Sequence, residues 1–354
     1  MADIENYGWN AAEKPDGADG MIARVTAVHR ERYELICENG ALFGKIKTGV
    51  YYGQGEEFPT VGDFVLIRYV QGGDSLIVKT LPRRSFFSRR DPTPGRGEQA
   101  VAANFDYCFA MASLNRDFNL KRMERYLTLA WQSGAVPVVV LTKVDLAGDH
   151  SAQVDVAREI APGVDVVAVS AVTGYGLDRL GEYLAPGKTA VFLGSSGVGK
   201  SSLVNALLGE ERMAVNSVRE DDSRGRHTTT HRQLIILPSG AMIIDTPGMR
   251  ELGMWDVSEG LGSAFDDVEA VLARGCKFSD CRHMTEPGCA VTAAIESGEL
   301  PAGRWQSYIS LKREARFSDD KSGALREKYA RTKAIAVWNK QRKKDSGKKQ
   351  RIEE

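Results

Sequence analysis

One segment, residues 194–201, limits the possible folds of this chain more than any other. It reads GSSGVGKS, fits the phosphate-binding pattern G-x-x-x-x-G-K-[ST], and lies between the apolar run TAVFL and the helical pattern SSLVNALLG. Glycines at these positions let backbone N–H groups turn toward a pyrophosphate at the start of a helix. Lys200 is expected to reach the β- and γ-phosphates, and the Ser201 hydroxyl to bind Mg²⁺. The predicted nucleotide-binding loop consists of Gly194, Ser195, Ser196, Gly197, Val198, Gly199, Lys200, Ser201 and Ser202.

Two further segments indicate which base is bound. Thr142, Lys143 and Asp145 belong to the sequence TKVD, which ends the apolar run VPVVVL. A carboxylate at the carboxyl end of a strand can accept both the N1–H and the N2 amino group of guanine, whereas adenine offers no such pair of donors. Ser170 and Ala171 end the next apolar run, where a backbone N–H can donate to guanine O6. The sequence therefore predicts a guanine nucleotide.

Two more segments have the residues that respond to a γ-phosphate. DTPG follows the run AMII, so Asp245 is expected to hold Mg²⁺ through water and the Gly248 N–H to contact the γ-phosphate. The sequence HTTT lies upstream of that strand. Of its threonines we choose Thr229 as the Mg²⁺ ligand, with Thr228 and Thr230 as alternatives.

The order of these motifs is unusual. Conventional GTPases have the phosphate loop first, whereas here TKVD at 142 and SA at 170 precede the loop at 194, HTTT at 227 and DTPG at 245. The same sheet can form if the chain is opened at a different point, so we predict a circularly permuted P-loop GTPase domain. Apolar runs alternate with helical patterns from residue 105 onward, which indicates an α/β fold with a mainly parallel sheet covered on both faces.

The N-terminal part has a different pattern. Five short strand-like runs, separated by turns that contain Gly, Asn or Asp, occur between residues 21 and 81. This spacing suits a small β-barrel, most simply an OB-like barrel, with an SH3-like barrel as the alternative. The next segment, PRRSFFSRRDPTPGRG, is rich in proline and arginine and is interpreted as a linker.

Three of the five cysteines lie close together near the C-terminus. Cys276, Cys281 and Cys289 flank His283, and together they offer three thiolates and one imidazole. That is a complete tetrahedral set for a structural Zn²⁺, so we predict one zinc ion per chain with no catalytic role. The other two cysteines, Cys37 and Cys108, lie inside apolar runs and are interpreted as small buried residues.

With these motifs in this order, the chain resembles the circularly permuted, ribosome small subunit-dependent GTPase A family over nearly its whole length. The motif order, the segment GRHTTT at 225–230 and the cysteine–histidine spacing at 276–289 are its most specific marks. The resemblance implies a factor that binds the 30S subunit and its 16S rRNA late in maturation. It also implies that the subunit stimulates GTP hydrolysis.

The residues suggest slow hydrolysis by the chain alone. Met249 stands where many GTPases place a water-orienting glutamine, and a thioether cannot orient the attacking water. We predict that His227 takes this role, with His231 or a group from a partner as alternatives. Arg224 and Arg226 are candidate phosphate contacts. His227, Lys200 and Thr229 are thus the expected catalytic residues.

Composition restricts any nucleic-acid contact to local surfaces. Lys and Arg total 47, as do Asp and Glu, so the net charge is zero, although residues 321–354 hold twelve basic residues against four acidic ones. The candidate RNA contacts are this tail, the aromatic residues Tyr51, Tyr52 and Phe58, and the arginines Arg83, Arg84, Arg89 and Arg90. Local packing is the alternative for the three aromatic residues. Phe43, Phe64 and Tyr69 are expected in the barrel core.

The resulting organisation is multidomain. We expect a mobile tail over 1–20, an OB-like barrel over 21–82, a linker and entry segment over 83–104, the permuted GTPase domain over 105–253, a zinc-binding helical module over 254–320 and a basic helical tail over 321–354. The acidic N-terminus and the short apolar runs predict a cytoplasmic protein with no membrane contact. Nothing in the sequence suggests an obligate interface, so we expect a monomer. A P-loop phosphotransferase and a zinc-dependent RNA-binding protein with a regulatory GTPase domain are the alternative functions.

Overall fold

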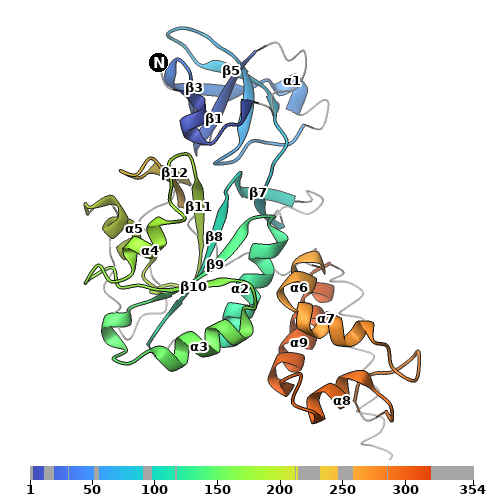
Figure 1. Ribbon diagram of the computed structural model, residues 1–354. Helices are drawn as coiled ribbons and strands as arrows, with labels where there is room; N and C mark the ends of the chain where they lie inside the picture. Colours follow the sequence, from blue (N-terminus) through green and yellow to red (C-terminus); the bar gives the residue numbers. More distant parts are fainter. Residues whose placement is uncertain are drawn as a thin grey trace, which may run out of the picture.

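Three units succeed one another along the chain: a barrel, an α/β unit and a helical unit (Figure 1). The computed structural model describes residues 3–11, 20–30, 32–51, 56–90, 98–115, 118–211, 213, 232–245, 258–284 and 286–319. The basic tail over 321–354 and residues 1–2 and 12–19 of the N-terminal tail lie outside the described residues.

The N-terminal barrel has the strand order of an OB fold. Strand β1 pairs with both β2 and β4, β3 pairs in parallel with β5, and β5 pairs with β4, so the five strands close on themselves in the order β1-β2-β3-β5-β4. This order confirms the OB-like barrel. The elements are η1 (Ile4–Tyr7), β1 (Met21–Val28), β2 (Tyr33–Cys37), β3 (Gly40–Ile46), α1 (Thr48–Tyr51), β4 (Phe64–Arg68) and β5 (Ser75–Thr80).

Two aromatic residues expected in the barrel core lie on its outside. Phe43 is 37% exposed and Tyr69 is 41% exposed. Phe64 is buried, but it packs with Trp9 and Leu66 in a cluster separate from that of the barrel interior. Side chains alternate along β3, and it is the neighbours of Phe43, Leu42 and Gly44, that face inward. Tyr69 lies beyond the last residue of β4 and so falls outside the alternation of that strand.

The aromatic residues proposed for RNA stacking differ from one another. Tyr51 is buried and its hydroxyl lies 3.0 Å from the Thr80 hydroxyl, so it packs inside the barrel. Phe58 is 45% exposed. Tyr52 lies outside the described residues.

The segment expected to be a linker instead forms an antiparallel strand pair, β6 (Phe86–Arg90) and β7 (Glu98–Ala103). The sequence VAAN at the end of β7 allows this arrangement, because its small side chains can be buried. Ala103 is fully buried, and its N–H donates to the Val61 carbonyl at 3.0 Å.

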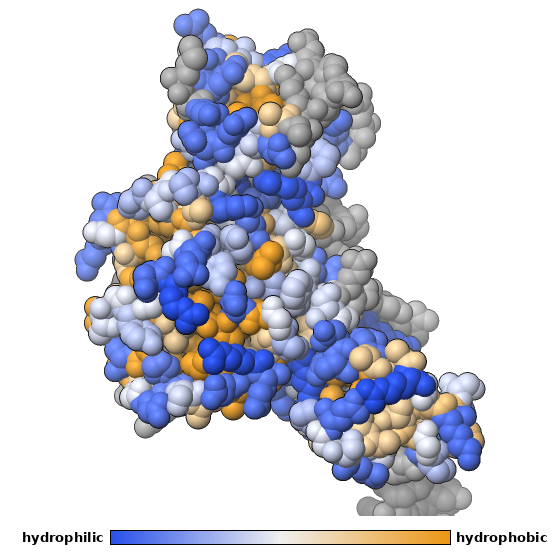
Figure 2. All heavy atoms as spheres, in the orientation of Figure 1, coloured by the Kyte–Doolittle hydropathy of each residue, from blue (hydrophilic) through white to orange (hydrophobic). Residues whose placement is uncertain are grey.

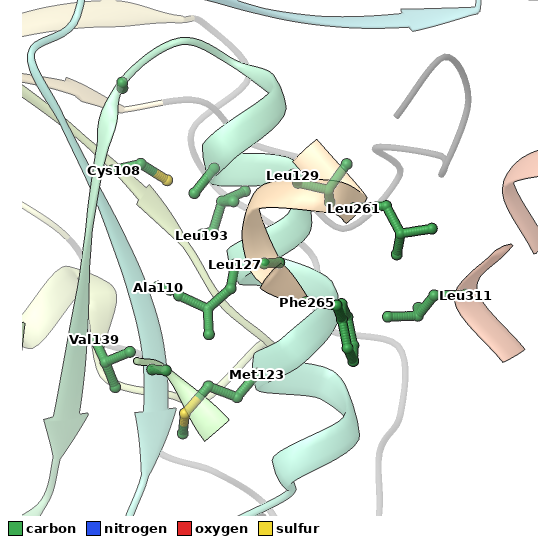
Figure 3. Close-up of a cluster of buried hydrophobic side chains, with 14 of the residues drawn as sticks. Cys108, Ala110, Met123, Leu127, Leu129, Val139, Leu193, Leu261, Phe265 and Leu311 are labelled. Carbon is green, nitrogen blue, oxygen red and sulfur yellow. The ribbon is translucent and has the colours of Figure 1, made fainter. Parts of the chain in front are cut away.

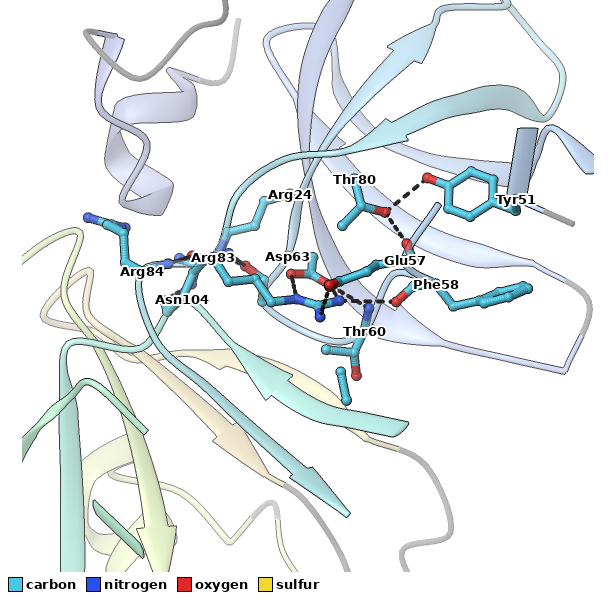
Figure 4. A network of polar contacts seen from close by, with 12 residues as sticks. Arg24, Tyr51, Glu57, Phe58, Thr60, Asp63, Thr80, Arg83, Arg84 and Asn104 are labelled. Carbon is cyan, nitrogen blue, oxygen red and sulfur yellow. Dashed lines mark hydrogen bonds and ion pairs between the residues drawn. The ribbon is translucent and has the colours of Figure 1, made fainter. Parts of the chain in front are cut away.

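Arg83, a candidate RNA contact, lies in the same segment. It forms two 2.8 Å hydrogen bonds with the buried carboxylate of Asp63 (Figure 4), so it is not a free phosphate contact.

The central unit is a sheet in which all strands but one are parallel. Its order is β10-β9-β8-β11-β13-β12, with β12 antiparallel at the end, where it pairs with β1 of the barrel. This is the α/β fold that the alternating pattern predicts. The elements are β8 (Tyr107–Ser113), α2 (Leu120–Gln132), β9 (Val136–Thr142), η3 (Val144–Leu146), α3 (Ser151–Ile160), β10 (Asp165–Ala168), α4 (Leu177–Gly181), β11 (Thr189–Leu193), α5 (Lys200–Leu208), β12 (Gln233–Ile236) and β13 (Met242–Asp245).

Each face of this sheet has its own hydrophobic core, because side chains alternate along the strands. On β8, Phe109 and Met111 join the core under α4 and α5. Cys108 and Ala110 join the core under α2, which is shown in Figure 3. That second core continues into the helical unit through Phe265 and Leu311, so the C-terminal helices pack directly on the GTPase unit.

The helical unit consists of α6 (Ser258–Ala264), α7 (Asp266–Ala273), α8 (Ala290–Glu296) and α9 (Ala302–Asp319). A buried arginine attaches it to α2. Arg304 forms 3.0 Å ion pairs with Glu124 of α2 and Asp267 of α7, and it also donates to the Ile160 carbonyl at 3.2 Å. Its guanidinium lies 4.1 Å from the centre of the Phe265 ring.

Among the described residues, none of the helices is both long and apolar enough to cross a membrane. On the face shown in Figure 2, hydrophobic residues form separate patches between hydrophilic ones.

The close contact between α6 and α2 predicts how substitutions of two glycines in α6 change the free energy of unfolding. At Gly260 a methyl group would overlap the Thr128 carbonyl oxygen and come within 2.7 Å of the Gln132 nitrogen, whereas at Gly262 of the same helix it would meet nothing within 4 Å. Gly260→Ala is expected to lower the free energy of unfolding by about 1–3 kcal/mol. Gly262→Ala, the matched control, should raise it by about 0.5–1 kcal/mol. Urea unfolding measures both, and equal effects would contradict this packing.

Candidate nucleotide and metal sites

The predicted phosphate loop joins β11 to α5 and has the geometry that its glycines allow. A methyl group at Gly194 would come within 2.9 Å of a Val198 methyl carbon and 3.1 Å of Met111 Cβ, so only glycine fits. Gly197 and Gly199 have positive φ angles of 72° and 103°. Such angles are strained for other residues, and they let successive N–H groups turn toward one side.

The Lys200 side chain lies over this loop. Its ammonium group donates to the carbonyl oxygens of Gly194 at 2.7 Å and Ser195 at 2.9 Å. Ser201 and Ser202 come next in the first turn of α5 and are half-buried. The start of a helix together with a lysine gives this loop the positive charge that a polyphosphate requires.

The two predicted base-binding segments meet at the ends of β9 and β10. Lys143 has a positive φ of 62°, which turns the chain into the short helix that holds Asp145. The Ser170 hydroxyl donates to an oxygen of the Asp145 carboxylate at 2.6 Å, and the same hydroxyl oxygen accepts the N–H groups of Val172 and Thr173 at 3.2 and 3.1 Å. Ser170 therefore orients the carboxylate predicted to bind guanine, and Ala171 lies beside it.

A third contact joins the base-binding segment to the phosphate loop. Thr142, the last residue of β9, donates its hydroxyl proton to the Val198 carbonyl at 2.5 Å. The loop and TKVD are separated by about fifty residues of chain, yet these two residues hold them together directly. The predicted nucleotide residues of β9, β10 and β11 thus form one connected group.

Asp245 ends β13, the strand next to β11, and is half-buried. It therefore lies at the same edge of the sheet as the phosphate loop, because the two strands are parallel. The other residues predicted to respond to the γ-phosphate, Gly248, His227 and Thr229, lie outside the described residues, as do Met249, Arg224, Arg226, His231, Thr228 and Thr230.

The four predicted metal ligands come together. The ligand atoms of Cys276, Cys281, His283 and Cys289 all lie within 4.8 Å of one another. His283 Nδ1 lies 3.5 Å from the sulfurs of Cys276 and Cys289 and 3.7 Å from that of Cys281. Tetrahedral bonds of about 2.3 Å to sulfur and about 2.0 Å to nitrogen imply separations of about 3.5–3.8 Å. The four residues therefore fit a tetrahedral metal ion.

The electrostatics of the cluster also favour a cation. Burial alone would raise the pKa of the Cys289 thiol, but hydrogen bonds from Thr292 and contact with His283 lower this pKa to about 6. Burial and the neighbouring thiols raise the pKa of Cys281 to about 11. The pKa values of these two thiols are therefore shifted in opposite directions, and a bound cation would favour the thiolate form of each ligand.

Sequence reasoning missed the residues that position this cluster. Trp305 of α9 lies edge-on to the His283 ring with 5.5 Å between ring centres, next to the buried Arg304 that reaches the GTPase unit. A tryptophan and an arginine inside a helical pattern carry no signal of either role, since the partners lie far away in the sequence.

Comparison with known proteins agrees with this arrangement. A sequence model of the RsgA GTPase family matches residues 80–255. The small ribosomal subunit biogenesis GTPase RsgA 1 of Listeria monocytogenes is 44% identical over 317 residues, which cover 89% of this chain and 90% of that protein. YjeQ from Thermotoga maritima, at 29% identity, superposes with a TM-score of 0.63 over 82% of this chain and 96% of its own. YloQ, described as a circularly permuted GTPase, superposes with a TM-score of 0.59 at 24% identity, over 87% of this chain and 99% of its own. The chain therefore belongs to the RsgA GTPase family and is a GTP-hydrolysing enzyme.

Proposed function

We propose that this enzyme hydrolyses GTP at the carboxyl ends of β9, β10, β11 and β13, and that it acts on the maturing small ribosomal subunit, which stimulates the hydrolysis. The observation that carries the proposal is the connected group formed by Asp145, Ser170, Thr142 and Val198, which joins a guanine-binding carboxylate to a phosphate loop. The name of the Listeria monocytogenes relative, a small ribosomal subunit biogenesis GTPase, supports the partner.

In this site each residue has a chemical role. Asp145 accepts the two guanine donors. The backbone N–H of Ala171 donates to O6, because that of Ser170 already donates to the Tyr175 carbonyl at 2.9 Å. The loop N–H groups and Lys200 bind the phosphates. Ser201, Asp245 and Thr229 would hold Mg²⁺, which neutralises charge on the β- and γ-phosphates when bound. The Gly248 N–H contacts the γ-phosphate.

Turnover by the chain alone is slow in this proposal, because Met249 supplies no group that orients water. His227 does so in the complex with the subunit. Supplying a catalytic group only in the complex makes the subunit the control point, and such groups contribute about 10³–10⁵-fold in other GTPases. The enzyme works as a monomer in the cytoplasm, where small subunits are assembled.

The metal of the cysteine–histidine cluster is zinc in this proposal. Three thiolates and one imidazole are ligands that zinc prefers, and four protein ligands leave no position for substrate. The ion then has a structural role: it holds the loop between α7 and α8 against Trp305.

The outer face of the barrel is the proposed contact with 16S rRNA. OB folds bind single strands on the face of β2 and β3 and with the loops between β1 and β2 and between β4 and β5. Each of these places has an exposed aromatic or basic residue here: Phe43 on β3, Arg32 in the first loop and Tyr69 in the second. The Arg32 guanidinium lies 3.9 Å from the centre of the Phe43 ring, which forms a surface on which bases can stack.

Replacing the guanine-binding carboxylate tests the nucleotide site. Asp145→Asn should weaken GTP binding by about 10–100-fold and strengthen binding of xanthosine triphosphate, because an amide can donate to the C2 oxygen of xanthine. Titration with both nucleotides measures the change. Asp149→Asn, the same change in a nearby exposed loop, is the control and should leave the preference for guanine intact. Unchanged GTP binding by Asp145→Asn would refute the base assignment.

Metal analysis tests the cluster. The purified chain should contain close to one zinc per molecule, and Cys281→Ala should lose it because a ligand is missing. Cys37→Ala, which changes a cysteine in the barrel core, should retain the zinc. The zinc assignment fails if the wild-type chain holds no zinc or if both variants keep it.

Binding to 30S subunits tests the barrel face. Phe43→Ala combined with Tyr69→Ala should weaken binding about tenfold, since stacking of a base on an aromatic ring contributes about 1–3 kcal/mol. Val136→Ala, which removes an exposed apolar side chain from the central sheet, should bind like wild type. Co-sedimentation in the presence of a non-hydrolysable GTP analogue measures the three affinities. Equal affinities would exclude this face as the contact.

A further inference from the structure

We infer that Asn205 of α5 is a positioning residue for GTP hydrolysis, because it fixes the point at which the chain leaves α5 toward His227 and Thr229. The inference rests on the proposed function, which gives those two residues their roles. Asn205 stands inside an ordinary helical run, so the sequence pattern offers no reason to single it out.

The side-chain amide of Asn205 binds one residue twice. Its nitrogen donates to the Met213 carbonyl at 2.8 Å, and its oxygen accepts the Met213 N–H at 2.7 Å. An amide suits this pairing because it has a donor and an acceptor side by side, as the backbone of a strand residue has. Asn205 is 9% exposed, so water competes little for either hydrogen bond. The backbone of Met213 is therefore fixed on α5.

The end of α5 does not need these two hydrogen bonds. Gly209 ends the helix in the left-handed conformation, with a φ of 72°, and its N–H donates to the Asn205 carbonyl at 2.9 Å. The amide instead reaches a residue beyond the helix. The Met213 side chain packs against the core under α5, as Leu207 and Leu208 do. Met213 is thus held by its backbone and by its side chain.

Asn205 also lies close to the part of the site proposed to bind Mg²⁺. It follows Ser201 by four residues in α5, so the two residues share one face of the helix with about 5–6 Å between their Cβ atoms. The segment that carries His227 and Thr229 leads into β12, where Gln233 pairs with Asp245 of β13. Both neighbouring ends are therefore fixed close to the proposed ligands Ser201 and Asp245.

Fixing both ends restricts the positions that residues between them can reach. With one end released, His227 and Thr229 could occupy a larger volume, so a smaller fraction of bound GTP would meet both residues. GDP has no γ-phosphate, and its proposed contacts come from the phosphate loop, α5 and the base-binding segments. Loss of the contact between Asn205 and Met213 should therefore slow hydrolysis and leave GDP binding intact.

The test compares turnover with GDP affinity in Asn205→Leu, which keeps the size of the side chain and removes both hydrogen bonds. Hydrolysis at saturating GTP and saturating 30S subunits should fall about tenfold, because both hydrogen bonds are lost. The affinity for GDP, measured with a fluorescent GDP derivative, should stay within about twofold of wild type.

Val204→Ala is the matched control. It opens a cavity in the core under the same helix and leaves both hydrogen bonds of Asn205 in place. This variant should retain the stimulated turnover and the GDP affinity of wild type, and thermal unfolding shows that each variant remains folded.

Three outcomes overturn the inference. Equal losses of turnover and GDP affinity in Asn205→Leu would mean that Asn205 supports α5 as a whole. Unchanged turnover would mean that its contact with Met213 does not serve hydrolysis. The same loss of turnover in Val204→Ala would mean that any weakening of α5 has this effect.

If Asn205→Leu fails to fold, Asn205→Asp decides. It keeps the acceptor and removes the donor, so it should slow stimulated hydrolysis without changing GDP affinity, and unchanged turnover would contradict the inference. A wild-type chain that 30S subunits do not stimulate would instead refute the proposed function, and the inference with it.

Discussion

Parallel strands bring their carboxyl ends to one edge of a sheet whatever the order in which the chain visits them, and this constraint underlies the whole nucleotide site. Here β11, with the phosphate loop, lies between β8 and β13, while β9 and β10 lie beyond β8. The motifs can therefore stand in a permuted order and still meet. The hydrogen bonds from Thr142 to Val198 and from Ser170 to Asp145 keep the two halves of the site in contact across the changed connectivity.

Permutation also changes the connection that the chain makes after β13. The chain leaves this strand toward the helical unit instead of returning to the sheet, and α6 then packs against α2 so closely that only glycine fits at position 260. On α9, Arg304 reaches Glu124 of α2 while the adjacent Trp305 contacts the ring of His283. The cysteine–histidine cluster is thus attached to the GTPase unit through two neighbouring residues of one helix.

Sequence reasoning succeeded where a function depends on local pattern. The phosphate loop and TKVD lie together as predicted, the four cysteine and histidine residues come together, and the alternation of side chains marked the barrel strands. It failed where contacts between distant segments determine the position of a side chain or the formation of a strand. Nothing local indicates that Arg83 is paired with the buried Asp63, that Phe43 faces outward, or that an arginine- and proline-rich segment forms the β6–β7 pair. The role of the Thr142 hydroxyl depends on a residue about fifty positions away, so only the folded chain reveals it.

The proposal that this GTPase depends on its partner for turnover rests on Met249, which stands where many GTPases have a water-orienting glutamine. The most direct test is steady-state GTP hydrolysis by the purified chain alone, with 30S subunits, with 50S subunits and with protein-free rRNA. We expect slow hydrolysis by the chain alone and strong stimulation by 30S subunits only. Fast hydrolysis without a partner, or equal rates with all four preparations, would contradict this expectation.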